Sequence, residues 1–169
     1  MRLVPALLAV AVAAHPALSQ VTSPATRSGR STVYAPRGAV GTSQPLATGA
    51  ALRILEAGGN AFDAAVAAAA VLNVTEPYMT GIGGDMFAIA WSARDGRLVG
   101  LDASGRAGSK ASAEALVDAG EDRVPYQGPR SITVPGALSG WQALLEAHGT
   151  MTLAQVLEPA IRIADEGFP

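Results

Sequence analysis

Cysteine and histidine, which supply thiol nucleophiles, imidazole bases and soft metal ligands, are almost absent from this sequence. The chain contains 2 histidines and no cysteine, so thiol nucleophiles, thiolate ligands and multi-histidine metal sites are excluded. His15 lies in an apolar N-terminal segment, which leaves His148 as the candidate base for a Ser-His-Asp triad. His148 also ends a predicted helix, where an imidazole interacts with the helix dipole or caps the helix. We favour this structural role.

Three further polar residues lie where a binding site could form. Asp85 follows a glycine-rich loop, Asp102 ends a predicted strand, and Arg106 lies among small polar residues. The two aspartates would either orient groups near a site or cap turns, and turn capping is the commoner role. Arg106 would either bind a carboxylate through its guanidinium or be an ordinary solvated arginine. The sequence indicates no metal site and calls for no cofactor.

Residues 58–87, which include Asp85 and precede the other candidates, predict a helix, a loop and the start of a strand. The Gly-Gly pair at its start is typical of a helix end, Asn60 of a helix N-cap, and Asp63 of a first helical turn. Residues 64–72 contain no polar side chain, which predicts a helix buried on several sides. The later glycines come after a helix and before a strand, the reverse of the dinucleotide-binding order.

The rest of the pattern predicts helices packed on a small sheet, an α/β or α+β layer architecture. Ser43 is the predicted cap of the first helix and Thr152 that of the last, in which Pro159 would produce a kink or a break. Asp95-Gly96 is a strong signal for a hairpin turn. The predicted strands are residues 38–41, 86–92 and 97–103, and the later helices are residues 113–120, 137–147 and 153–166.

Composition narrows the class of protein. With 169 residues, 49% of them hydrophobic, the chain has one domain's length and enough apolar material for a core. Its formal net charge of −2 indicates no nucleic-acid partner. Residues 1–19 combine a basic start, a short apolar run and small residues, which predicts a cleaved signal peptide. A cytosolic helix or a membrane anchor is the alternative. We expect an exported protein, periplasmic or extracellular, with no membrane segment after cleavage and with residues 20–33 as a flexible leader.

Several motifs carry a resemblance to a known family. Residues 58–87 read GGNAFDAAVAAAAVLNVTEPYMTGIGGDMF and resemble the start of the large subunit of γ-glutamyltranspeptidases and their acylase relatives. The resemblance continues through LDASGRAGSKAS and VPGALSGWQALLEAHGTMTLAQVLEPAIRIADEGF, and covers about residues 39–168. It implies a partial four-layer αββα sandwich of the N-terminal nucleophile hydrolase type. Residues 34–169 would then be the incomplete N-terminal segment of such a large subunit.

The resemblance also implies an activity. The family hydrolyses or transfers the acyl group of amides, with glutathione or another γ-glutamyl amide, small molecule or peptide, as the expected substrate class. The precursor cuts itself, and the new N-terminal threonine of the small subunit becomes the nucleophile. No residue of this chain corresponds to that threonine, so we assign no catalytic residue. We expect the chain to be inactive without the remainder of its precursor, which comprises the rest of the large subunit and the small subunit.

One substrate contact of the family falls within this chain. γ-Glutamyltranspeptidases carry an arginine just after the second hairpin strand, in an Asp-x-Arg-Glu context, and it binds the α-carboxylate of the γ-glutamyl group. Counting from Asp102 puts Ser104 at that position and Arg106 two residues later. Arg106 is therefore the candidate substrate-binding residue, acting from a shifted backbone, or else a solvated arginine. The departure leaves open a related acylase that acts on a different amide.

A second hypothesis belongs to another class of protein. The chain could be a non-catalytic exported binding or structural domain that has the front half of the fold without its chemistry. Such a domain would fold alone as a soluble monomer, whereas part of a sandwich would expose sheet edges and apolar helix faces. We prefer the enzymatic hypothesis, because the apolar helix at 64–72 needs more cover than this chain is expected to supply.

Overall fold

The computed structural model describes residues 32–169. The chain divides into two units, the second of which is residues 35–169, and every described helix and strand belongs to this second unit. The predicted signal peptide and most of the predicted leader lie outside the described residues. Within residues 32–169, no helix is long and apolar enough to cross a membrane.

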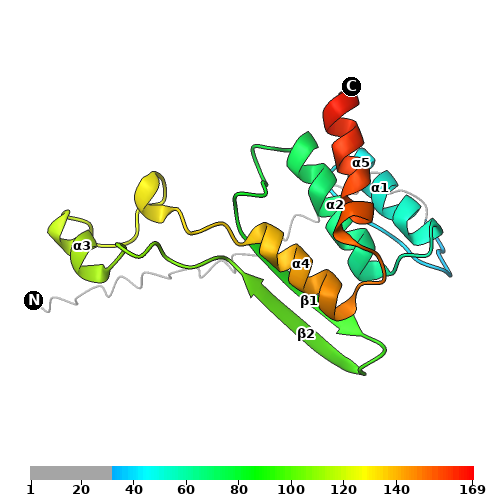
Figure 1. Cartoon of the computed structure of the whole chain (residues 1–169), viewed down its shortest axis with the longest axis horizontal. Coiled ribbons are helices and arrows are strands. Elements are labelled where there is room, and N and C mark those ends of the chain that lie inside the picture. Colours follow the sequence, from blue (N-terminus) through cyan, green and yellow to red (C-terminus); the bar gives the residue numbers. More distant parts are fainter. Residues whose placement is uncertain (1–31) are drawn as a thin grey trace, which may run out of the picture. The chain divides into compact units, whose positions relative to one another are not determined.

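The second unit contains the predicted helices and the predicted hairpin (Figure 1). In chain order its elements are α1 (Pro45–Glu56), α2 (Ala61–Thr75), β1 (Met86–Ser92), β2 (Arg97–Ala103), α3 (Ala113–Asp118), the short 3₁₀-helix η1 (Pro129–Ser131), α4 (Ala137–His148) and α5 (Leu153–Glu166). The predicted strand at 38–41 is wrong, because no described strand pairs with this segment and a strand needs a hydrogen-bonded neighbour. Val40 instead packs, half-buried, on the helical core. α5 runs unbroken through Pro159.

The two strands form an antiparallel hairpin. Its register runs from Met86 opposite Ala103 to Ser92 opposite Arg97, which matches the predicted strand bounds. Gly96 in the turn has φ 61°, a left-handed conformation that glycine adopts without strain. The predicted hairpin is confirmed, and its side chains alternate between two faces of the sheet.

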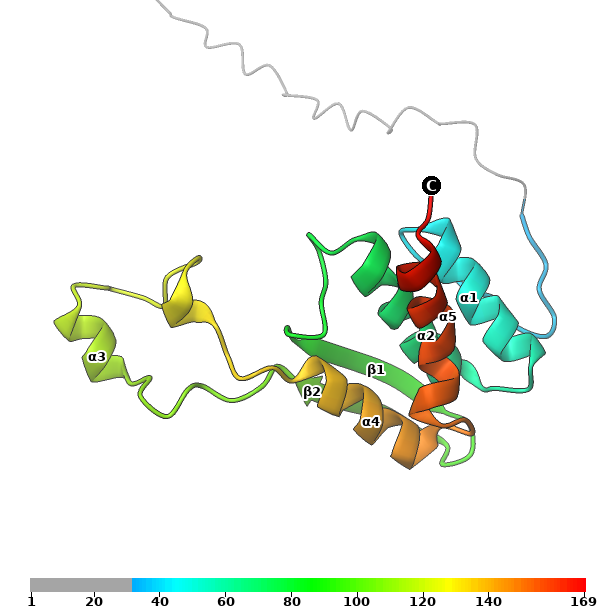
Figure 2. The ribbon, with the colours of Figure 1, turned by 45° about the horizontal axis from the view of Figure 1, so that its top comes forward.

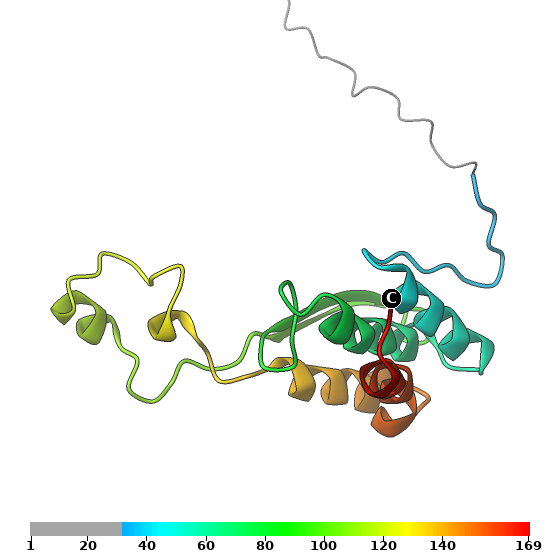
Figure 3. The same cartoon turned by 90° about the horizontal axis from the view of Figure 1, so that it is seen from above.

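α4 lies along one face of the hairpin (Figures 1 and 3). Small and aliphatic side chains of that face meet Leu144 of α4 around a small cavity of about 110 Å³. The other face carries four large apolar side chains that are 63–81% exposed: Phe87, Ile89, Trp91 and Leu98. The described residues are therefore a mixed helix and sheet structure, as predicted, with one sheet face covered by helix and one left open.

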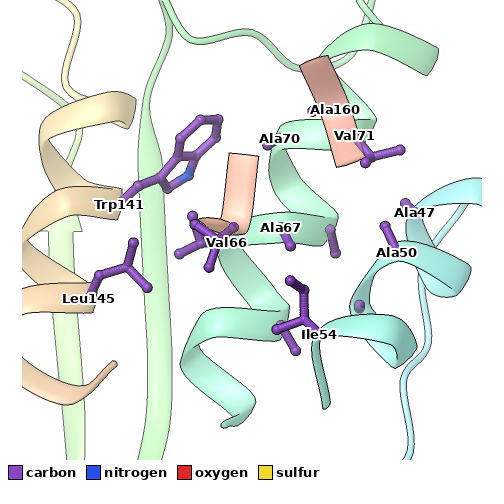
Figure 4. Close-up of a cluster of buried hydrophobic side chains, with 14 of the residues drawn as sticks. Ala47, Ala50, Ile54, Val66, Ala67, Ala70, Val71, Trp141, Leu145 and Ala160 are labelled. Carbon is purple, nitrogen blue, oxygen red and sulfur yellow. The ribbon is translucent and has the colours of Figure 1, made fainter. Parts of the chain in front are cut away.

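α2 is the central helix and packs against α1, α4 and α5 (Figure 2). Residues 64–72 were predicted to be buried on several sides, and this is confirmed. The buried residues of α2 are Asp63, Ala64, Val66, Ala67, Ala68, Ala70 and Val71. Figure 4 shows Trp141 and Leu145 of α4 reaching toward Val66 on one side, with Ile54 of α1 on the other. Alanines at the contacts let the helix axes approach closely. Leu138, in the first turn of α4, is 43% exposed.

A buried carboxylate ties the start of α2 to the loop between α4 and α5. Asp63 is fully buried, with 0% of its surface exposed. It accepts hydrogen bonds from the N–H of Asn60 (2.8 Å), the N–H and hydroxyl of Thr150 (3.0 and 2.6 Å) and the N–H of Met151 (3.1 Å). Asn60 completes the capping box of α2 and donates from its amide to the carbonyl of His148 (2.7 Å). Two segments distant in sequence are thus joined at one carboxylate.

The charge of Asp63 is stabilised by these donors. Burial opposes ionisation, but the hydrogen bonds from Thr150, Asn60 and Met151 outweigh it and hold the pKa of Asp63 below the ordinary value of 3.8. The folded chain therefore keeps this buried group as a carboxylate near neutral pH.

The other helix caps are partly as predicted. Thr152 caps α5 and forms a capping box with Gln155. The prediction that Ser43 caps α1 is wrong, because the side-chain oxygen of Gln44 accepts from the first-turn N–H groups. The hydroxyl of Ser43 donates instead to Glu76 beyond the end of α2 (2.7 Å).

Replacing Asp63 with asparagine should lower the free energy of unfolding by about 2–4 kcal/mol, since an amide cannot accept all four hydrogen bonds and turns donors toward donors. Urea unfolding of the chain measures the loss. Asp165→Asn, an exposed position on α5, is the matched control and should change stability by less than about 0.5 kcal/mol. Equal losses in the two variants would contradict a special role for Asp63.

The lowered pKa of Asp63 also makes stability depend on pH. As the pH is lowered through the ordinary value of 3.8, Asp63 is protonated in the unfolded chain at a higher pH than in the folded chain. The free energy of unfolding therefore decreases as the pH is lowered. The contribution of Asp63 is fully present above that value and is lost as pH falls through the lowered folded pKa. The stability difference between wild type and Asp63→Asn should be constant from about pH 7 to 5 and shrink below about pH 4. A constant difference down to about pH 3 would show that the carboxylate is not the cause.

Candidate functional site

A broad hollow lies where β2 ends. It has a volume of about 930 Å³ and is lined by residues 101–107 and 109, by residues 134–136, and by Ser139, Gly140 and Ala143 of α4. Two of the sequence-predicted candidates, Asp102 and Arg106, line it together. The end of a strand, the loop after it and the first turns of a helix thus form one concave surface, the arrangement typical of small-molecule sites.

Backbone hydrogen bonds hold three loop segments together around this hollow. The N–H of Val134 donates to the carbonyl of Arg106 (2.8 Å), and the N–H groups of Gly136 and Ala137 both donate to the carbonyl of Gly84 (3.1 and 3.0 Å). The loop before β1, the loop after β2 and the segment before α4 are therefore fixed to one another by main-chain contacts, whatever side chains they carry.

Two glycines permit this close approach. Gly105 has φ 79°, and a Cβ there would lie 1.8 Å from the carbonyl oxygen of Val134. A Cβ on Gly136 would lie 2.1 Å from the carbonyl oxygen of Ala103. Any other residue would push the segments apart. Sequence reasoning did not single out these positions.

Thr133 contributes a side-chain contact to the same junction. Its hydroxyl donates toward the carbonyl of Ser104 (2.8 Å) and toward Oδ1 of Asp85 (3.1 Å). Thr133 lies next to Val134, which holds Arg106. Asp85, predicted as a candidate near the site, is thus brought to it through Thr133, which the sequence did not point to.

Asp102 and Arg106 differ in how they are held. Oδ1 of Asp102 accepts from the N–H of Ser104 (3.0 Å), and hydrogen bonds from the backbone and then the side chain of Ser104 lower the pKa of Asp102. Asp102 therefore caps the turn that follows β2. The Arg106 side chain is exposed at the hollow and forms no ion pair within residues 32–169. Its guanidinium is available to an anion.

His148 lies away from this hollow and does not form a triad. Its Nδ1 is 3.8 Å from Oδ2 of Asp95, while the hydroxyl of Ser92 donates to that same carboxylate oxygen (2.7 Å). Hydrogen bonds from Ser92 and then Arg94 lower the pKa of Asp95. Because serine contacts aspartate rather than histidine, no base is placed to activate the serine. His148 is the last residue of α4 and stacks on Phe62 with ring centroids 4.8 Å apart.

A metal centre has no candidate within the described part of the chain. In residues 32–169, no three histidine or acidic side chains gather as metal ligands would. What the hollow offers is one exposed guanidinium, the Asp102 carboxylate that caps the turn after β2, backbone polar groups and small side chains. That combination can bind and orient an anionic group, and it includes no paired nucleophile and base.

Comparisons with known proteins agree on one family. The family described as Gamma-glutamyltranspeptidase matches residues 47–169. A glutathione hydrolase-like proenzyme of Bacillus subtilis (strain 168) is 45% identical over 125 residues, which are 73% of this chain and 23% of that protein. The crystal structure of Helicobacter pylori gamma-glutamyltranspeptidase superposes with a TM-score of 0.73 at 35% identity, covering 82% of this chain and 40% of that one.

An acylase is similar to the same extent. The crystal structure of a cephalosporin acylase from Bacillus halodurans gives a TM-score of 0.70 at 45% identity, covering 83% of this chain and 28% of that chain. This chain thus spans about a quarter of the length of the curated relative, 23%, which is consistent with the N-terminal part of a large subunit. The family match includes α1 from Ala47 onward and every later element. The chain belongs to the gamma-glutamyltranspeptidase family.

Proposed function

We propose that this chain is the N-terminal segment, residues 34–169, of the large subunit of an exported amide hydrolase or acyltransferase of the γ-glutamyltranspeptidase type. Residues 1–19 would be its signal peptide and residues 20–33 its leader. The observation that carries the proposal is the family match over residues 47–169, combined with a hollow at the end of β2 that exposes Arg106. Relatives named as glutathione hydrolases and as acylases support amides as the substrate class.

The chain's part in this activity is to bind the substrate. The family resemblance supplies the nucleophile from elsewhere, as the N-terminal threonine of the small subunit. Its hydroxyl attacks the amide carbonyl, the amine leaves with a proton, and water or an acceptor amine then releases the acyl group. The residues described here include no activated nucleophile, in keeping with a wall of the site rather than its centre.

Arg106 is the proposed contact to the substrate carboxylate. A guanidinium presents paired N–H donors that match a carboxylate in two parallel hydrogen bonds. Ser104, at the position the family's arginine would take, has its backbone turned into the Asp102 cap and its carbonyl toward Thr133. Arg106 follows it on the same loop and lines the hollow. A two-residue shift of the charged group along this loop changes the point from which the guanidinium reaches the substrate carboxylate.

A related acylase acting on a different amide is the second candidate. It is favoured by the shifted arginine and by the 45% identity with a cephalosporin acylase structure. Both candidates share the same reaction and differ in where the acyl group carries its charge. A set of amide substrates with the carboxylate at different positions would separate them.

The open face of the hairpin supports the rest of the sandwich. One face of the sheet exposes 63–81% of four large apolar side chains, Phe87, Ile89, Trp91 and Leu98. Such an apolar patch is unusual on the solvent-exposed surface of a folded protein. A second sheet from the remainder of the precursor, packed on this face, would complete the four-layer αββα arrangement that the resemblance implies.

The proposed function makes a first prediction about where activity resides. The chain ending at Pro169 should release no amine from a γ-glutamyl anilide above the blank. The protein expressed from its gene with all coding sequence downstream of Pro169 should cleave itself before a threonine and then release amine. A stop codon directly after Pro169, or activity in the shorter chain, would overturn the proposal.

In the active protein, Arg106→Ala should lower kcat/KM for carboxylate-bearing amides roughly 10- to 100-fold, as expected for the loss of a charge-assisted hydrogen bond worth about 1.5–3 kcal/mol. Arg106→Lys should recover part of the loss, because it restores the charge without the paired donors. Steady-state kinetics with carboxylate-bearing and neutral amides measure both effects.

Arg123→Ala is the control for a general charge effect. Arg123 is an exposed arginine, 81% accessible at its side chain, that pairs with the neighbouring Asp122. Its removal should leave kcat/KM within about twofold of wild type. A loss at Arg123 equal to that at Arg106 would indicate long-range attraction of the substrate rather than a contact.

A further inference from the structure

Thr133 sits where three chain segments meet at the wall of the hollow. Thr133 is half-buried, and its hydroxyl lies 2.8 Å from the carbonyl oxygen of Ser104 and 3.1 Å from Oδ1 of Asp85. A hydroxyl carries one hydrogen, which is therefore shared between these two acceptors. Asp85 belongs to the loop before β1 and Ser104 to the loop after β2, so the hydroxyl links loops that are not neighbours in sequence.

The backbone of Arg106 depends on this link from both sides. Ser104 lies two residues before it, and the residue after Thr133, Val134, donates its N–H to the carbonyl of Arg106 (2.8 Å). Between them, Gly105 packs its Cα against the carbonyl of Val134 so closely that no Cβ fits. The loop carrying Arg106 therefore follows the segment carrying Thr133 as one unit.

We propose that Thr133 is a positioning residue that sets how far the Arg106 guanidinium reaches into the hollow, and that it thereby tunes the preference for substrates carrying a carboxylate. This inference rests on the proposed function. Thr133 itself contacts no reacting atom. It acts by holding the backbone at both ends of Gly105, which fixes the point from which the arginine side chain extends.

The hydroxyl, rather than the volume of the side chain, carries this role. Valine has nearly the same shape as threonine and would fill the same space. It would, however, remove the donor that the Ser104 carbonyl and the Asp85 carboxylate share. Both acceptors then lose a hydrogen bond, and the loop after β2 is no longer tied to Asp85 through this side chain. A guanidinium displaced by about 1 Å loses the geometry needed for paired hydrogen bonds.

The test uses the protein expressed from its gene with the coding sequence downstream of Pro169. Two substrates are compared, a γ-glutamyl anilide and the 4-aminobutanoyl anilide, which lacks only the α-carboxylate. Thr133→Val should raise KM for the first roughly tenfold with kcat within about twofold, the pattern of lost binding rather than lost chemistry. It should leave the second substrate unchanged. Thr133→Ser keeps the hydroxyl and should restore KM.

A double variant shows whether Thr133 acts through Arg106. In the Arg106→Ala background, Thr133→Val should have no further effect on KM, since the group it positions is gone. Thr75→Val is the matched control. It removes a hydroxyl that donates to the carbonyl of Val71 within α2 (3.1 Å), away from the hollow, and should leave KM unchanged for both substrates.

The outcomes separate this inference from the proposed function. If Arg106→Ala weakens only the carboxylate-bearing substrate and Thr133→Val does not, the inference fails and the proposed function stands. If Thr133→Val weakens both substrates equally, or still acts after Arg106 is removed, its role is structural and the inference fails. If the complete protein cleaves neither substrate, or Arg106→Ala is silent, the proposed binding role fails and the inference fails with it.

Discussion

The buried carboxylate of Asp63 is the contact on which the arrangement of the helices depends. A charge inside a protein is tolerated only where hydrogen bonds replace water, and here four donors from Asn60, Thr150 and Met151 do so. Those donors belong to the cap of α2 and to the loop that joins α4 to α5. Because the carboxylate fixes that loop, it fixes the end of α4 against α2. α4 then lies on the hairpin, and its first turns meet the end of β2 at the hollow. The site is thus positioned by an ion that takes no part in it.

Small residues make these contacts short enough to be rigid. α1 and α2 meet through alanines such as Ala47, Ala50 and Ala67, all 0% exposed. At the other end of α4, Gly140 approaches β2 so closely that a Cβ would lie 2.6 Å from Cβ of Ala103. Side chains of this size lose little conformational entropy on folding. The close packing around them leaves no space for a larger residue. The low aromatic content, 5%, is therefore matched to a fold whose layers are held close together.

Local signals predicted most of the elements, and long-range contacts explain what the sequence could not predict. Asn60, Asp95-Gly96 and Thr152 act within a few residues of themselves, so the α2 cap, the hairpin turn and the start of α5 were predictable. Asp63 was predicted as a first-turn residue, but its hydrogen bonds to Thr150 span 87 positions, and no local sequence pattern predicts them. The failed strand at 38–41 has the same cause, since a strand exists only when another pairs with it. In the site, Arg106 was found by its place in a motif. Thr133, 48 positions from Asp85, became visible only once the loops were folded together.

The open sheet face and the hollow are parts of one surface. Pairing puts Phe87 directly opposite Asp102 in the hairpin, and alternation places both on the face that α4 does not cover. Asp102 caps the turn that leads to Arg106, so this apolar face ends at the mouth of the hollow. A layer that packs on Phe87 must therefore stop beside the loop that carries Arg106. Under the proposed function, a layer that covers the sheet would therefore also close the hollow. That layer would be in position to bring the nucleophile that the described residues do not include.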